Sequence, residues 1–192
     1  MFQQLRVAIL MLVWLTIFTG GVYPLVVTLV AQMACPHQAT GSVIRQGAQL
    51  RGSELIGQSF TQPQYFWGRL SATTPVPFNA AASSGSNFGP LHPQLKAAAE
   101  ARIAALKQHP MPQQAIPVDL VTSSGSGLDP HVSPAAADFQ IPRVAAARHL
   151  SEDTVRTLVR QHTAGRQFGL LGEPRVNILQ LNLELDRLSR AE

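Results

Sequence analysis

Residues 117–137 read PVDLVTSSGSGLDPHVSPAAA, and this stretch decides how the polar part of the chain is organised. A shorter copy of its loop comes forty residues earlier, where 83–90 read SSGSNFGP against SSGSGLDP at 123–130. The shared order S-S-G-S-x-x-x-P indicates a specified backbone shape, since ordinary linkers drift in composition. We expect a strand over Ile116–Val121, then a tight turn, then a short helix with Ser133 as N-cap and Pro134 in its first turn.

The N-terminus is a long apolar segment. Val7–Val30 is 24 residues without a charge, which as a helix spans roughly 36 Å and can cross a bilayer core of about 30 Å. A cleaved signal peptide has a shorter apolar region and ends in a small-x-small site, which Ala31–Ala34 does not supply. The sequence therefore predicts an uncleaved single-pass anchor over residues 1–34.

The charges that flank the anchor predict its orientation. Arg6 and the free amine lie on the N-terminal side, and the next positive charge is Arg45. By the positive-inside rule we expect the N-terminus in the cytoplasm and residues 35–192 outside, periplasmic or extracellular. Cys35 is the only cysteine, so the chain can form no internal disulfide and its compartment cannot be inferred from cysteines.

Small and polar residues gather in the second half of the anchor. Thr16 and Gly20 are four residues apart and share a helix face, where small side chains allow a second membrane helix to approach closely. Pro24 removes a backbone donor and is expected to kink the last turn. Such residues are also common in membrane helices without any partner. We interpret the group as a partner-helix contact; its members are Thr16, Thr19, Gly20, Tyr23 and Pro24.

Residues 35–192 are long enough for one domain with its own core. The basic residues are dispersed and form no run, which argues against nucleic-acid binding. We predict an α+β fold, in which one N-terminal transmembrane helix is followed by a single mixed α/β soluble domain. Its expected parts are strands and turns over Gln38–Gln58, a core corner at Tyr65–Arg69, and helices over Pro93–Gln108, Ser151–His162 (capped by Ser151) and, less clearly, Asn177–Leu188 (capped by Asn177).

Three chemical interpretations of the Ser/Gly loop are open. Its backbone N–H groups could bind a phosphate, although the Walker pattern and its lysine are absent. A serine hydrolase would pair Ser124 or Ser126 with Asp129 and His131, but G-x-S-x-G is absent. The third interpretation is a rigid turn that presents Asn87–His92 and Asp129–Ser133 to a partner. It requires no catalytic or phosphate-binding motif. The histidines show no metal-ligand spacing, so we predict neither a catalytic residue nor a metal site. The candidate partner or nucleotide residues are Ser124, Gly125, Ser126, Gly127, Asp129, His131, Asn87 and Gly89.

Several motifs together resemble one family of membrane transport proteins. The sequence is similar to the C subunit of the Kdp potassium-transporting P-type ATPase of bacteria and archaea. Of these motifs, the long loop and the segment GLLGEPRVN are the most specific. The segments that carry the resemblance are TGGVYP at 19–24, GSELIGQSF at 52–60, YFWGR at 65–69, Ser84–Pro90, Asp119–Ala137 and GLLGEPRVN at 169–177.

The resemblance implies a non-catalytic accessory subunit in the bacterial inner membrane. Its implied partners are a channel-like potassium-translocating subunit and a P-type subunit that hydrolyses ATP. Members are described as catalytic chaperones that raise the pump subunit's affinity for ATP through a transient complex. A domain outside the membrane cannot reach cytoplasmic ATP, so the expected effect is indirect, with no cofactor bound firmly by this chain. Direct nucleotide binding, or an anchored serine hydrolase, is the alternative.

Overall fold

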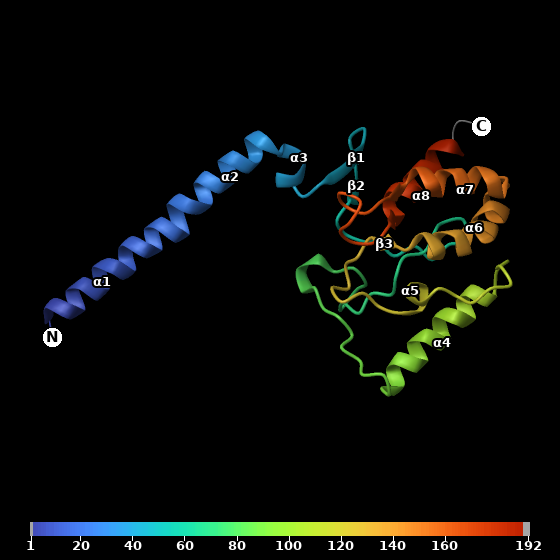
Figure 1. Cartoon of the computed structure of the whole chain (residues 1–192), viewed down its shortest axis with the longest axis horizontal. Coiled ribbons are helices and arrows are strands. Elements are labelled where there is room, and N and C mark those ends of the chain that lie inside the picture. Colours follow the sequence, from blue (N-terminus) through green and yellow to red (C-terminus); the bar gives the residue numbers. More distant parts are fainter. Residues whose placement is uncertain (1, 190–192) are drawn as a thin grey trace. The chain divides into compact units, whose positions relative to one another are not determined.

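The computed structural model describes residues 2–189 and divides into two compact units, residues 1–51 and 52–192. The fold is mixed α and β, as the sequence predicts, and Figure 1 traces its elements. In chain order they are α1 (Phe2–Ile17), η1 (Phe18–Val22), α2 (Tyr23–Ala34), α3 (Pro36–Ala39), β1 (Val43–Gln46), β2 (Gln49–Ser53), η2 (Ala80–Ala82), α4 (Pro93–Lys107), α5 (Val118–Val121), β3 (His131–Val132), α6 (Pro134–Arg148), α7 (Glu152–Gln161), β4 (Thr163–Ala164), β5 (Arg175–Asn177) and α8 (Ile178–Leu188).

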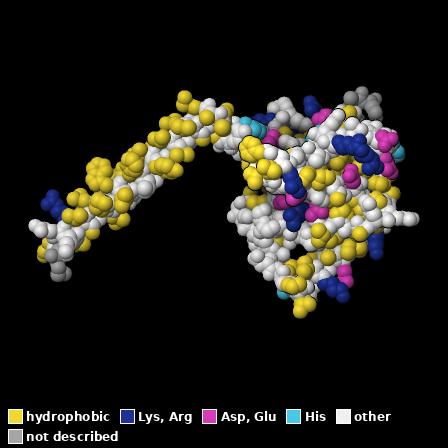
Figure 2. All heavy atoms as spheres, in the orientation of Figure 1, with side chains coloured by type: hydrophobic (Ala, Val, Ile, Leu, Met, Phe, Trp, Pro, Cys, Tyr) yellow, Lys and Arg dark blue, Asp and Glu magenta, His cyan; other side chains and the backbone are white. Residues whose placement is uncertain are grey.

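The first unit is dominated by one continuous helical segment. Elements α1, η1 and α2 together span Phe2–Ala34, 33 residues that include a stretch of 18 with a mean hydropathy of 2.0. Their length and composition suffice to cross a membrane, and Figure 2 shows hydrophobic side chains along the whole segment. The predicted membrane-spanning helix is therefore present in length and composition.

The middle of this segment widens into a π-helical turn. The Tyr23 N–H donates to the Phe18 carbonyl, five residues back, and Gly20 and Gly21 lie inside the turn. Pro24 follows immediately, where its missing N–H is accommodated at the start of α2. The prediction that Pro24 lies in the last turn of the helix is wrong, because the helix continues for ten residues beyond it; the kink itself stays a prediction.

The predicted strands and turns after the anchor are confirmed in part. Strands β1 and β2 form a two-stranded sheet, and Gly47 provides the left-handed conformation (φ +60°) that their tight connection needs. The start of this region differs from the prediction, because Pro36–Ala39 forms the helical turn α3. Pro36 suits its first turn, since it lacks only an N–H that would have no helical partner.

The second unit is organised around a small sheet, with strand order β3-β5-β4. Both pairs are antiparallel: His131 lies opposite Asn177, and Thr163 opposite Val176. Helices α6 and α7 pack against each other, and β5 leads directly into α8. Figure 1 shows these three helices grouped together, with α4 apart from them and near α5. The core combines helix and sheet residues, among them Leu120, Val132, Phe139, Ile141, Val144, Val155, Val159, Val176, Leu181 and Leu185.

The helix caps predicted from the sequence are confirmed. The Ser133 hydroxyl accepts from the Ala136 N–H, the Ser151 hydroxyl from Thr154, and the Asn177 side chain from Gln180. The Asn177–Leu188 region, which alternates like a strand but also fits a helix, forms the helix α8. Helix α4 ends at Lys107, one residue before the predicted end.

One predicted element is wrong. Residues 118–121 form the single helical turn α5 instead of a strand. The Thr122 hydroxyl donates back to the Val118 carbonyl at 2.8 Å, and only Leu120 of the turn is fully buried. An apolar run this short fits a buried helical turn as well as a strand, which periodicity cannot distinguish. Extended pairing begins only afterwards, where Ser123 forms a parallel bridge with Leu70.

The helix after the long loop is longer than predicted, because α6 continues through Pro142 to Arg148. The carbonyl four residues before a helical proline loses its partner, and here it belongs to the exposed Asp138. His149 follows as the C-cap, and its left-handed backbone (φ +56°) is typical of the residue after a helix.

The aromatic corner at Tyr65–Arg69 lies in the core, as predicted. Phe66 and Trp67 are buried, yet they belong to no strand, so their backbone groups need other partners. Asn182 bonds both the N–H and the carbonyl of Phe66, at 2.9 and 3.0 Å. Gln140 does the same for Trp67, at 2.8 and 3.1 Å. Two buried side-chain amides thus replace a neighbouring strand.

Candidate functional site: the paired Ser/Gly loops

The two S-S-G-S loops lie against each other. The Ser126 carbonyl accepts from the Ser84 N–H and from the Ser83 hydroxyl, both at 3.0 Å. The Ser123 and Ser86 hydroxyls are 3.0 Å apart. The repeat therefore has one role that the sequence did not reveal: the two copies bind each other.

Two glycines allow this close approach. A Cβ on Gly85 would lie 2.7 Å from the Gly125 carbonyl oxygen. A Cβ on Gly127 would lie 2.6 Å from the Ser84 carbonyl oxygen, and the backbone there is left-handed (φ +68°). Real Cβ atoms do not come that close to backbone oxygens. A Cβ on Gly125 or Gly89, in contrast, would meet nothing within 4 Å.

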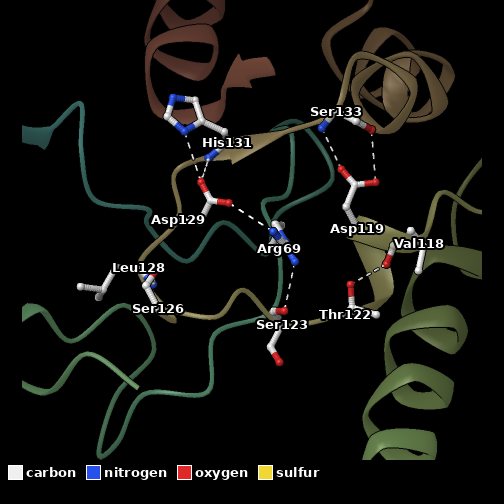
Figure 3. A network of polar contacts seen from close by, with 10 residues as sticks. All are labelled: Arg69, Val118, Asp119, Thr122, Ser123, Ser126, Leu128, Asp129, His131 and Ser133. Carbon is white, nitrogen blue, oxygen red and sulfur yellow. Dashed lines mark hydrogen bonds and ion pairs between the residues drawn. The ribbon is translucent and has the colours of Figure 1, made fainter. Parts of the chain in front are cut away.

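Several N–H groups of the long loop are already bonded within the protein. Ser124 donates to Leu70, Gly127 to Ser124, and Leu128 to the Ser126 hydroxyl. The N-terminus of α6, where a phosphate could bind, is occupied by Asp119: its carboxylate accepts from the Ser133 N–H at 2.7 Å and the Ser133 hydroxyl at 3.2 Å (Figure 3). The N–H groups of Ser124, Gly127, Leu128 and Ser133 are therefore already bonded within the protein and are not open to a phosphate.

The serine-hydrolase arrangement is also absent from the described residues. Ser124 is 3% exposed and its hydroxyl is buried without a partner, while Ser126 accepts from a backbone N–H. His131 lies instead against Asp129, with its Nδ1 3.2 Å from the carboxylate. No serine hydroxyl is bonded to the His131 ring in this part of the chain, so a nucleophile is not in place.

Asp129 is the centre of a small charged group. Figure 3 shows Arg69 reaching from one side, with its Nη1 3.3 Å from the Asp129 carboxylate, while His131 lies on the other. Arg69 also donates to the Ser123 carbonyl at 3.1 Å, so it joins both ends of the long loop. Burial alone would raise the pKa of Asp129, but the hydrogen bonds from His131 and the charges of His131 and Arg69 outweigh it. The pKa of Asp129 is lowered.

The lowered pKa gives a prediction about stability at acid pH. A carboxyl whose pKa is lower in the folded state stabilises the fold above its ordinary pKa of 3.8, and this contribution disappears as pH falls through the folded value. We expect Asp129→Asn to lower the melting temperature at neutral pH. The difference from wild type should shrink as pH falls below about 4. Melting curves at several pH values test this; a difference that stays constant down to about pH 2 would contradict it.

The other predicted site residues lie apart from this group. Asn87 is exposed with a left-handed backbone (φ +50°), and Gly89 is exposed beside it. The expected partner-helix residues all lie in the first unit. Thr16, Gly20 and Tyr23 are exposed on its long helix, and the Thr19 hydroxyl donates to the Leu15 carbonyl. Among residues 2–189, no three His, Cys, Asp or Glu side chains lie close enough together to hold a metal ion.

Two arginines near Trp67, the half-buried Arg102 and the buried Arg143, have no signal in the sequence. The guanidinium carbons of Arg102 and Arg143 lie 4.7 and 4.0 Å from the centre of the Trp67 ring. Burial lowers the pKa of Arg102 to about 10; burial and the charge of Arg102 lower the pKa of Arg143 to about 9. Arg102 falls in the helix predicted over Pro93–Gln108, and its position there indicates no special role.

Together these features define a class of protein: a small α/β domain that follows one N-terminal helix of membrane-spanning length and composition. Its most specific motif is structural, since the two loops bond to each other.

Comparison with known proteins identifies the family. The family model described as K+-transporting ATPase, c chain (KdpC), matches residues 5–187. The chain belongs to this family, as its motifs suggested. Proteins named potassium-transporting ATPase KdpC subunit are 60% identical in Herpetosiphon aurantiacus (184 residues, 95% of either chain) and 58% identical in Ralstonia nicotianae (185 residues, 96% of this chain and 91% of the relative). A third, from Burkholderia mallei, is 56% identical over 187 residues, 97% of either chain.

Proposed function

We propose that this chain is a non-catalytic accessory subunit that stabilises a potassium-transporting ATPase complex and promotes ATP turnover by the subunit that hydrolyses ATP. The observation that carries the proposal is that polar groups of the two loops form hydrogen bonds with each other. Ser84 and Ser126 are bonded together, and Asp119 fills the helix terminus that a phosphate would need. Of the three interpretations of the loop, a rigid surface that binds another protein agrees best with these bonds.

The proposed partners are the potassium-translocating subunit and the ATP-hydrolysing subunit of the same complex. We place the N-terminus in the cytoplasm and the α/β domain outside, because Arg6 and the free amine are the charges nearest the start of the helix. With that orientation ATP and the domain lie on opposite sides of the membrane. The effect on ATP turnover then passes through the partner subunits, and this chain itself holds no cofactor firmly.

Labelling of Cys35 tests the orientation. Cys35 is the only cysteine, follows the end of α2 directly and is exposed. A membrane-impermeant maleimide added to intact cells is expected to label the wild-type chain, and Cys35→Ser should remain unlabelled. Labelling only after the cells are opened would place the domain inside and make direct contact with ATP possible.

The helix face that contains Gly20 is proposed to contact a partner helix. Gly20→Leu should reduce the amount of partner subunits that co-purify with the chain by roughly tenfold, because a large side chain separates helices that pack through small residues. Val22→Leu, in the same turn but on the far side of the helix from Gly20, is the matched control and should assemble normally. Normal assembly of Gly20→Leu would show that this face makes no close contact.

A further inference from the structure

A groove lies between α4 and the paired loops. Its volume is about 500 Å³, which is within the range of sites that bind ligands of drug-like size. One wall comes from α4, through Leu95, Ala98 and Ala101. Gly85 belongs to the opposite wall, so the pairing of the two loops forms part of the groove.

The groove is mostly apolar but contains one cation. Arg102 is the only charged residue among the described residues that line it. The guanidinium donates to the Leu120 carbonyl at 3.1 Å and the Gly68 carbonyl at 2.7 Å, which uses two of its five N–H donors. No Asp or Glu carboxylate in residues 2–189 forms an ion pair with it.

A second arginine, Arg143, lies near Arg102 and also has no carboxylate partner among the described residues. Arg143 stacks on the same Trp67 ring, is 3% exposed, and has a buried Nη1 without a partner. Its Nη2 donates to the uncharged Gln140 side chain at 2.6 Å. Two desolvated guanidiniums therefore lie close together with no carboxylate to compensate them in the described part of the chain, although buried charges are normally paired. Because Arg102 is the one that lines the groove, an anionic group entering there would supply the missing partner.

The apolar surface extends beyond the groove, which favours a polypeptide over a small molecule. Leu91, between Phe88 and Leu95 in the chain, is 96% exposed, and Phe88 stacks on His92 at 4.5 Å. Large exposed apolar side chains beside a groove are typical of protein-binding surfaces. A ligand that only filled the groove would leave Leu91 in water.

We propose that the groove binds a segment of another subunit of the same complex, a segment that is apolar and carries one Asp or Glu whose carboxylate pairs with Arg102. This inference rests on the proposed function, and it adds a location and a chemistry for the contact. The segment packs its apolar side chains on α4 and the paired loops. Its carboxylate accepts from the guanidinium N–H groups, an arrangement for which arginine is well suited.

Filling the groove tests the proposal without altering Arg102, which also has structural bonds. Ala98 lines the groove and is exposed, so Ala98→Phe should leave the fold intact and block the segment. Ala97 is exposed on the same helix but does not line the groove, which makes Ala97→Phe the matched control. In the full-length chain expressed with its partner subunits, Ala98→Phe should reduce their recovery by about tenfold, whereas Ala97→Phe should assemble like wild type.

A photo-crosslinker identifies the segment. With p-benzoylphenylalanine in place of Leu91, illumination of the purified complex should link this chain to one partner subunit, at an apolar segment that includes Asp or Glu. A crosslink to lipid alone, to no partner, or to a segment without a carboxylate would overturn the inference, as would normal assembly of Ala98→Phe. A different result would contradict the proposed function: a complex made without this chain that hydrolyses ATP at the wild-type rate.

Discussion

Gly127→Ala should lower the free energy of unfolding of the α/β unit by about 2–4 kcal/mol and its Tm by roughly 6–12 °C. The new Cβ would lie 2.6 Å from both the Ser84 carbonyl oxygen and the Thr73 Cγ2. The left-handed backbone (φ +68°) adds a further cost for any residue with a Cβ. Thermal melting of the full-length chain in detergent measures the effect.

Gly125→Ala is the control for this prediction. It lies in the same loop, two residues away, and its Cβ would meet nothing within 4 Å. It should therefore melt within about 2 °C of wild type, as surface substitutions generally do. Equal melting of the two variants would mean that the loops do not pack against each other as described.

Asn182→Leu is expected to cost about 2–5 kcal/mol of unfolding free energy. Leucine has a similar size, but it can bond neither the N–H nor the carbonyl of Phe66, and both would remain buried without partners. Each such group costs about 1–3 kcal/mol. A urea titration of the full-length chain in detergent measures the loss.

The matched control is Gln180→Leu, in the same helix. Gln180 is half-buried, and its backbone N–H, rather than its side chain, makes the capping bond to Asn177. The control should change stability by less than about 1 kcal/mol. A similar loss in both variants would show that the helix tolerates no leucine here, and that the Asn182 amide has no special role.

Local signals predicted much of the fold. Ser133, Ser151 and Asn177 cap the helices that begin after them because a capping residue acts within three residues of its own position. The strand expected before the long loop is a helical turn, since the pattern of a four-residue segment is too short to distinguish the two. Helix α6 is longer than the predicted short helix; it continues through Pro142, and the carbonyl that the proline leaves without a helical partner belongs to the exposed Asp138.

The candidate site was harder to predict because its contacts join distant parts of the chain. The sequence showed that the S-S-G-S order occurs twice, but the Ser84–Ser126 bond links residues forty-two positions apart and has no local signal. The same holds for Arg102, which meets Trp67 and the Gly68 carbonyl through tertiary packing. Asp129 and His131, two residues apart, are the one pair that the sequence brought together and that the structure joins.

The central claim is that this chain promotes ATP hydrolysis by a partner subunit and does not hydrolyse ATP itself. The most direct test is potassium-stimulated ATP hydrolysis by the purified complex, measured over a range of ATP concentrations with and without the chain, beside the chain alone. We predict that omission reduces turnover, most strongly at low ATP, and that the chain alone hydrolyses no ATP. Normal turnover without the chain, or hydrolysis by the chain alone, would contradict the account.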